Sequence, residues 1–152
     1  MKMMMKKQMM ALLLGVCVST VSYAQESVKV EGESLTEKSE KVIVNKRKTG
    51  ETIVGNFGKG EWIKLENIDF GKDKRRIKVR AASGSKSRKA SIEIRLDSKD
   101  GEVIGRIKVP VEGWNTFTEA DAALSKAVSN KHDVYLLSLS GGIVLDWVEF
   151  IK

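Results

Sequence analysis

Few side chains in this sequence could act as catalytic groups. The 152 residues include one histidine, His132, and one cysteine, Cys17. A serine nucleophile would need His132 as its base, and no serine lies in the sharp turn that exposes such nucleophiles. Acidic residues are numerous enough for a glycosidase pair, but the sequence does not place two of them across a cleft. We therefore expect His132 to be a surface residue and the protein not to be an enzyme.

A glycine-rich stretch at Gly55–Gly60 is the second candidate for chemistry. A phosphate-binding loop needs a helix N-terminus directly after its glycines. Here Glu61–Leu65 follows with the alternation of a strand, and no Lys-Ser or Lys-Thr pair is present. The pattern favours a loop that shapes one rim of a β-sandwich.

The first 24 residues have the order of a secretory signal peptide. Lys2, Lys6 and Lys7 precede the apolar run 11–18, and Ser22–Ala24 supplies the small residues of a cleavage site. The run is too short for a membrane span, and Val16 before Cys17 does not suit lipidation. We expect residues 1–24 to be removed and residues 25–152 to be exported, to the periplasm or outside the cell.

The charge balance argues against nucleic acid as a partner. Subtracting the three signal lysines from 27 basic residues leaves 24, against 20 acidic ones, a net of +4. The dense basic runs are Lys72–Arg76 and Lys86–Lys89, which we interpret as loop charges between strands. The positive balance slightly favours an acidic polysaccharide as the ligand.

Apolar and polar residues alternate with period two along most of residues 25–152, as in antiparallel strands with one solvated face. Asp100-Gly101 predicts a tight hairpin, Gly141-Gly142 predicts the turn of the last hairpin, and Ser83–Lys89 predicts a longer loop. The pattern predicts an all-β fold of antiparallel sheets, a β-sandwich or a jelly roll. The expected strands are Ser27–Glu31, Lys41–Asn45, Trp62–Ile68, Arg76–Ala82, Ser91–Asp97, Glu102–Val109, Ala120–Val128 (whose alanines would also suit a helix), Val134–Ser140 and Ile143–Ile151.

Several segments, in order, match the pattern of a known family from Val30 to Phe150. The chain resembles the family-six carbohydrate-binding modules, jelly-roll domains that are appended to polysaccharide-degrading enzymes. The matching segments are Val30–Leu35, Gly60–Leu65, Ile68–Gly71, Ile92–Ser98, Gly101–Gly105, Gly113–Phe117 and Leu145–Phe150.

The resemblance implies a sugar site in the loops at one edge of the sandwich. In the family, a sugar lies between two aromatic rings, beside an asparagine near the last strand. Trp114 falls on one aromatic position, Asn56 stands at the other, and Val144 stands at the asparagine position. Phe57 or Phe117 would be a substitute for the missing ring, and some members use the concave sheet face instead.

The tryptophans have a structural interpretation as well. Trp114 either contacts a ligand or is a loop residue folded onto the core. Trp62 and Trp147 lie in alternating strands, where we expect core packing.

The resemblance also implies a structural calcium ion. The family's carboxylates on the first and last strands correspond to Glu31, Glu33 and Asp146. Glu31 and Glu33 are two residues apart, which places them on the same face of a strand, and calcium prefers such oxygen ligands. Ordinary surface acids are the alternative.

Two functions remain open from the sequence. The first is a non-catalytic module that binds a polysaccharide or oligosaccharide through Trp114, alone or with a partner glycoside hydrolase or other extracellular protein. The second is a structural or protein-contact sandwich that has lost sugar binding, which the residues at positions 56 and 144 would favour. We expect neither nucleic acid binding nor a membrane span.

Overall fold

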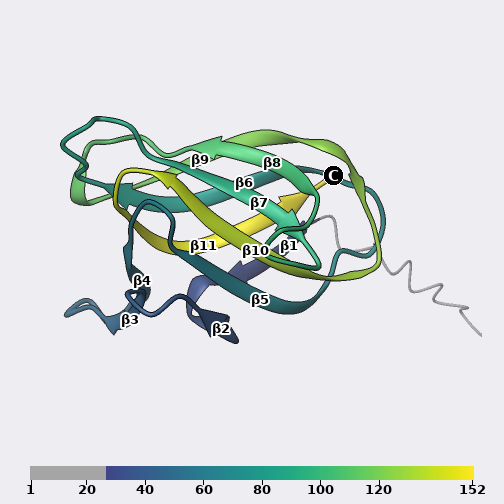
Figure 1. Ribbon diagram of the computed structural model, residues 1–152, viewed down its shortest axis with the longest axis horizontal. Coiled ribbons are helices and arrows are strands. Elements are labelled where there is room, and N and C mark those ends of the chain that lie inside the picture. The colour runs from purple at the N-terminus through teal and green to yellow at the C-terminus, as the bar shows by residue number, and fades with distance from the viewer. Residues whose placement is uncertain (1–26) are drawn as a thin grey trace, which may run out of the picture.

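The computed structural model describes residues 27–152, and the expected signal peptide lies outside them. These residues form two stacked antiparallel sheets (Figure 1). The elements are β1 (Ser27–Glu31), the 3₁₀ turn η1 (Gly32–Ser34), β2 (Glu37–Lys38), β3 (Ile43–Lys46), β4 (Thr52–Phe57), β5 (Trp62–Asp69), β6 (Lys74–Ser83), β7 (Ser91–Leu96), β8 (Val103–Lys108), β9 (Gly113–Val128), β10 (Lys131–Ser140) and β11 (Ile143–Ile151).

The strands pair mostly with partners that are distant in the sequence. One sheet, sheet A, has the order β3-β4-β11-β6-β9, and β1 pairs with β11 as well. The other, sheet B, has the order β2-β5-β10-β7-β8. Only β3–β4 and β7–β8 are hairpins, and the remaining connections cross between the sheets. This confirms the predicted jelly-roll sandwich.

The prediction of a last hairpin at Gly141-Gly142 is wrong. These glycines connect β10 to β11, but the two strands belong to different sheets. The hairpin at Asp100-Gly101 is confirmed, because β7 and β8 pair across it. A pair of glycines marks a sharp turn in either case, so the sequence could not tell a hairpin from a sheet-to-sheet crossing.

Alternation along the strands builds the core between the sheets. On β6, Ile77, Val79 and Ala81 are fully buried, while Lys78 and Arg80 project outward. On the inner face of sheet B, Ile92 and Ile94 of β7 are also fully buried. The rings of Phe70 and Phe150 meet at 4.6 Å between centroids. The period-two pattern therefore identified which side chains face the core.

All nine expected strands are present, including the alanine-rich Ala120–Val128 as the second half of β9. The sequence missed two strands, β2 and β4. Thr52–Phe57 is strand β4, so the glycine-rich stretch begins inside a strand rather than in a loop. A methyl group on Gly55 would lie 3.3 Å from Ile43 of the neighbouring strand, and the missing side chain leaves room for that isoleucine.

The outer face of sheet B carries polar residues and a pair of aromatic residues. Trp62 projects outward and packs against Tyr135, with 6.0 Å between ring centroids. The prediction that Trp62 lies in the core is wrong, because Ile63 and Leu65 take the inward positions of β5. Trp147 is buried at 8% exposure, and Lys29 lies 4.5 Å from its ring.

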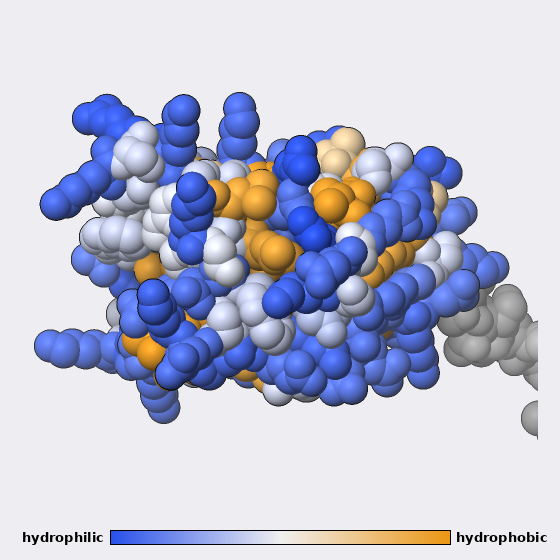
Figure 2. Space-filling model, viewed as in Figure 1, coloured by the Kyte–Doolittle hydropathy of each residue, from blue (hydrophilic) through white to orange (hydrophobic). Residues whose placement is uncertain are grey.

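The molecular surface is mainly hydrophilic. On the face shown in Figure 2, apolar side chains appear in separate patches between charged ones. One such patch lies over β3, whose Ile43 and Val44 are exposed. Residues 27–152 contain no helix with the length and hydrophobicity that a membrane crossing requires.

Candidate functional site

Trp114 stands at the surface on a seat made by two glycines. Its side chain is 50% exposed, and it comes from the start of β9. A methyl group on Gly84 would lie 2.5 Å from the ring nitrogen of Trp114, and one on Gly142 would lie 2.7 Å from the far ring edge. The indole therefore rests directly on the backbone of two loops. Ser83 Oγ donates to the carbonyl of Gly142 at 2.6 Å and ties these loops together.

The other residues predicted for the sugar site lie around the same hollow. Asn56 is exposed near the end of β4, with a left-handed φ of 50°. Val144 is half-buried on β11 and also lines the hollow. Phe57 lies beneath the hollow, but its side chain is completely buried in the core. The fold thus brings Trp114, Asn56 and Val144 together, while the ring of Phe57 is not exposed to a ligand.

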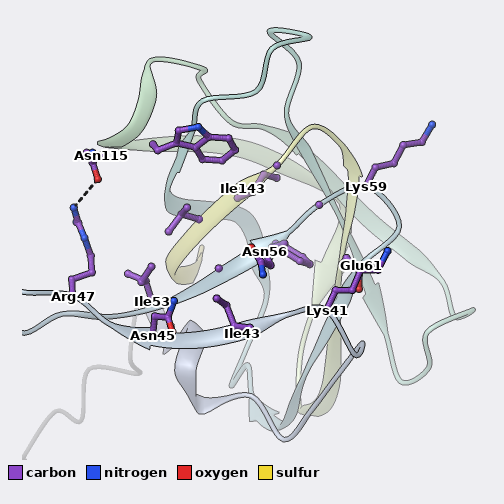
Figure 3. A pocket seen from close by; sticks show the side chains of 16 residues that line it. Lys41, Ile43, Asn45, Arg47, Ile53, Asn56, Lys59, Glu61, Asn115 and Ile143 are labelled. Atoms are coloured by element: carbon purple, nitrogen blue, oxygen red, sulfur yellow. Dashed lines mark hydrogen bonds between the residues drawn. The ribbon is translucent and has the colours of Figure 1, made fainter.

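The hollow is an open groove of about 820 Å³ at one end of the sandwich (Figure 3). This volume lies within the range of about 300–1,000 Å³ that is usual for ligand pockets. Ile43, Ile53 and Gly55 form much of its apolar floor, and Trp114 forms one wall.

The polar lining of the groove is rich in amides and cations. Its amides are Asn45, Asn56 and Asn115, its cations are Lys41, Arg47 and Lys59, and its acid is Glu61.

The charged groups of the lining differ in how far they are already paired. Ser39 Oγ donates to the carboxylate of Glu61. Arg47 forms an ion pair with Glu51 at 3.3 Å and approaches the amide oxygen of Asn115 at 3.5 Å.

Strand β3 and its flanks supply the residues of this site that the sequence did not reveal. Lys41, Ile43, Asn45 and Arg47 alternate along the chain, and all four line the groove. Period two places such residues on one side of a strand. That signal was present in the sequence, but only the packing of β3 beside β4 shows that this side faces Trp114.

Phe117 is not among the residues that line the groove, and two guanidinium groups lie beside its ring. The side-chain carbons of Arg47 and Arg80 each lie 4.8 Å from its ring centroid. Since both approaches meet the cation–π distance of about 6 Å, the faces of this ring are already in use. Phe117 is therefore not a free stacking partner for a sugar.

A second hollow, of about 440 Å³, gathers the three carboxylates predicted for calcium. Glu31, Glu33 and Asp146 line it together with Lys29 and Arg80. The expectation that Glu31 and Glu33 share a strand face is wrong, because β1 ends at Glu31 and Glu33 lies in the turn η1. Gly32 in this turn packs tightly against the last strand. A methyl group added to it would lie 3.1 Å from the carbonyl oxygen of Asp146.

The charges in the acidic hollow are only partly balanced. Asp146 is paired with Arg80, and Lys29 Nζ lies 3.8 Å from Glu31. Burial raises the pKa of Glu31; Lys29 opposes this, while Glu33 and Asp146 add to it by repulsion. Oxygen Oε2 of Glu33 is buried without a hydrogen-bond partner.

These features fit calcium in their chemistry and fall short in their spacing. Three carboxylates with an unpartnered buried oxygen are the kind of ligands that calcium prefers. Within residues 27–152, however, no three acidic, histidine or cysteine side chains lie close enough to hold a metal. Beside Asp146, the positive charge is supplied by the guanidinium of Arg80 rather than by a metal ion.

Both ring nitrogens of His132 lie within hydrogen-bond distance of neighbouring oxygen atoms. Its Nδ1 lies 2.9 Å from the carboxylate of Asp97, and its Nε2 lies 2.9 Å from the carbonyl of Ser129. These contacts connect the start of β10 to the end of β7. Within residues 27–152, no serine hydroxyl is among the hydrogen-bond partners of the His132 ring.

The comparison with protein families gives one result for nearly the whole described chain. Residues 31–152 match the family described as carbohydrate binding module (family 6). A family 6 module from Clostridium cellulolyticum, solved in complex with xylose, superimposes with a TM-score of 0.74 at 32% identity. The match covers 82% of this chain and 97% of that module.

The curated relatives are larger enzymes. An arabinoxylan arabinofuranohydrolase from Paenibacillus polymyxa is 32% identical over 98 residues, which are 59% of this chain and 14% of that enzyme. An endo-1,4-β-xylanase from Thermoclostridium stercorarium is 30% identical over 104 residues, 68% of this chain and 19% of the enzyme. The chain thus spans less than a fifth of the length of these relatives. From its sequence match and its fold, the chain belongs to family 6 of the carbohydrate-binding modules.

Proposed function

We propose that this protein is a non-catalytic module that binds a polysaccharide or oligosaccharide in the groove beside Trp114. The observation that carries the proposal is the half-exposed indole fixed on Gly84 and Gly142. A pyranose presents C–H groups on its face, which pack on an aromatic ring, and hydroxyls on its rim, which need placed polar partners. The asparagines of the groove supply such partners.

The residues at positions 56 and 144 weaken this site relative to the family pattern. A stacked ring contributes about 0.5–1.5 kcal/mol beyond its buried area, and a hydrogen bond contributes a similar amount. Loss of both corresponds to a decrease in affinity of roughly 10- to 100-fold. The groove therefore has to draw on its other polar residues.

The relatives suggest the kind of polymer to test first. The curated relatives are named for arabinoxylan and xylan, and the solved module at 32% identity was captured with xylose. Binding rather than cleavage is supported by the share of the enzymes that this chain matches, 14–19% of their length. The signal-like N-terminus supports export, where a glycoside hydrolase or another extracellular protein would be a partner.

We propose further that Glu31, Glu33 and Asp146 hold a structural calcium ion. The unpartnered oxygen of Glu33 and the raised pKa of Glu31 support this, because a cation would relieve both. To bind the metal, the three carboxylates would have to move closer together, and Asp146 would exchange its ion pair with Arg80 for calcium.

The alternative function is a protein-contact module without sugar binding. It is favoured by the missing ring at position 56 and by the exposed Ile43 and Val44 on β3. In that case the groove would face another protein rather than a glycan.

A glycan-array screen of the purified protein, with calcium present, tests the proposal. We expect binding to a defined set of glycans and its loss in Trp114→Ala, with the melting temperature little changed, since the ring is half-exposed. A hit that survives Trp114→Ala but is lost in Trp62→Ala would move the site to the Trp62–Tyr135 face of sheet B. A folded protein that binds nothing on a broad array would support the protein-contact function.

A further inference from the structure

The groove beside Trp114 carries an excess of positive charge. Of its charged lining residues, Lys41, Arg47 and Lys59 are cations and Glu61 is the acid. In Figure 3, Arg47 lies near Asn115 at one end of the groove, and Lys41 and Lys59 lie toward the other end. Positive charge is therefore present at both ends of the channel that a sugar chain would follow.

Two of these cations, Lys41 and Lys59, have no ion-pair partner within residues 27–152. Among residues 27–152, every salt bridge within 4.0 Å involves cations other than Lys41 and Lys59. Elsewhere on sheet A, some outward cations are paired, such as Arg76 with Asp121 and Lys78 with Glu119. Others, such as Lys46 and Arg75, are in no salt bridge within residues 27–152. Lys41 and Lys59 thus differ from Arg76 and Lys78 in being unpaired, and from Lys46 and Arg75 in lining the groove.

The acid of the groove does not balance the two lysines. The Glu61 carboxylate accepts a hydrogen bond from Ser39, whose Oγ also accepts one from the backbone of Trp62 at 2.9 Å. Glu61 is thus fixed to the strand backbone at the rim. The charged lining residues sum to a formal +2, and one positive charge remains when Arg47 is counted as paired with Glu51.

We propose that the groove selects anionic sugars, a chain whose residues carry carboxylate or sulfate groups. This rests on the proposed sugar-binding function and names its substrate class. Trp114 stacks on the face of one sugar unit, and Lys41 and Lys59 pair with the anionic groups of neighbouring units. These charge-assisted hydrogen bonds compensate for the aromatic ring that Asn56 replaces, since they are about twice as strong as neutral ones.

Titration calorimetry with a matched pair of ligands tests the selection. The probes are an oligogalacturonate and the same oligosaccharide with its carboxylates reduced to alcohols, and a sulfated oligosaccharide distinguishes sulfate from carboxylate. We expect at least one anionic probe to bind about 10-fold more tightly than its neutral counterpart at low salt. The preference should decrease as salt shortens the screening length from about 10 Å at 0.1 M to about 3 Å at 1 M.

Charge variants locate the effect. Lys41→Gln with Lys59→Gln should remove most of the preference for the anionic probe, measured for the variant as the ratio of its affinities for the anionic and the neutral probe. The control, Lys46→Gln with Lys48→Gln, removes the same charge from exposed residues outside the groove lining. We expect this control to retain the preference.

The outcomes separate the inference from the function on which it rests. Equal binding of the charged and neutral oligosaccharides, or a preference that both double variants reduce alike, overturns the selection for anions but leaves sugar binding intact. Absence of binding to every glycan overturns the proposed function and this inference together.

Discussion

The two hollows of the sandwich differ in how far their charged side chains are paired. Beside Trp114, the ring is half-exposed and Lys41 and Lys59 have no ion-pair partner within residues 27–152. In the acidic hollow, Arg80 pairs with Asp146, and Lys29 lies over the buried Trp147 and beside Glu31.

This difference separates recognition from structure. An exposed ring and unpaired cations leave interaction free energy available for a visiting ligand. The acidic hollow, whose charges are largely paired, instead lies where the first strand meets the last, because Glu31 ends β1 and Asp146 lies on β11. The first hollow should therefore govern affinity, and the second should govern stability.

The sharpest test of the groove beside Trp114 changes one of the two glycines on which the indole rests. Gly142→Ala would place a methyl group 2.7 Å from the ring edge and force the indole to move. We expect sugar affinity to fall about 10-fold or more, the equivalent of about 1.4 kcal/mol, as measured by calorimetry. Gly58→Ala is the control, since its added methyl group meets no atom within 4 Å. Equal affinities for the two variants would show that the seat does not position the ring.

The second half of the comparison depends on calcium. We expect calcium at 100 times its dissociation constant to add about 2.7 kcal/mol of stability, a rise of about 5 °C or more in melting temperature. A chelator should reverse it, and Glu31→Gln should abolish it. An unchanged melting temperature with calcium would leave Arg80 as the cation of this hollow.

The pH dependence of the calcium-free protein follows from the raised pKa of Glu31. A carboxyl whose pKa is higher in the folded state disfavours folding once pH rises above its unfolded value of about 4.3. Without calcium, Glu31→Gln should therefore be at least as stable as the wild type at pH 7, and its relative advantage should shrink toward pH 4. Thermal melts of the variant and the wild type across this range measure the effect. The predicted sign would be contradicted if the stability of the variant minus that of the wild type were lower at pH 7 than at pH 4.

The smallest expected effect restores the missing ring. Asn56→Tyr should increase the affinity for neutral sugars about 2- to 10-fold, because a second ring faces Trp114 across the groove. The left-handed φ of 50° at this position suits asparagine, so tyrosine should cost about 1–2 kcal/mol of stability. Calorimetry and denaturant unfolding measure the two effects, and an unchanged affinity would mean that position 56 does not meet the ligand.

Much of the fold was predictable because alternation is a local property. Strands such as β6 and β7 have strict period-two patterns, and their inward residues are those that the pattern indicated. Strand β4 was missed because Gly55 and Asn56 are typical of turns, and only the fit of Ile43 against Gly55 explains a glycine there. Trp62 was misassigned because alternation identifies two faces without saying which holds a large aromatic residue.

The site was predictable only in part. Trp114, Asn56, Val144 and the three carboxylates were found by resemblance to a family, and the structure places each group around one hollow. Lys41 and Arg47, which also line the groove, flank strand β3, a segment that the resemblance did not mark as part of the sugar site.

The sequence by itself determined the all-β class, the inward faces of most strands and the family, since these depend on local alternation and ordered motifs. The tertiary structure decided which strands pair, that Gly141-Gly142 crosses between sheets, and that Arg80 meets Asp146. It also decided which cations line the groove together with Trp114. These outcomes depend on contacts between residues far apart in the chain, and period two carries no information about which partner a strand face will meet.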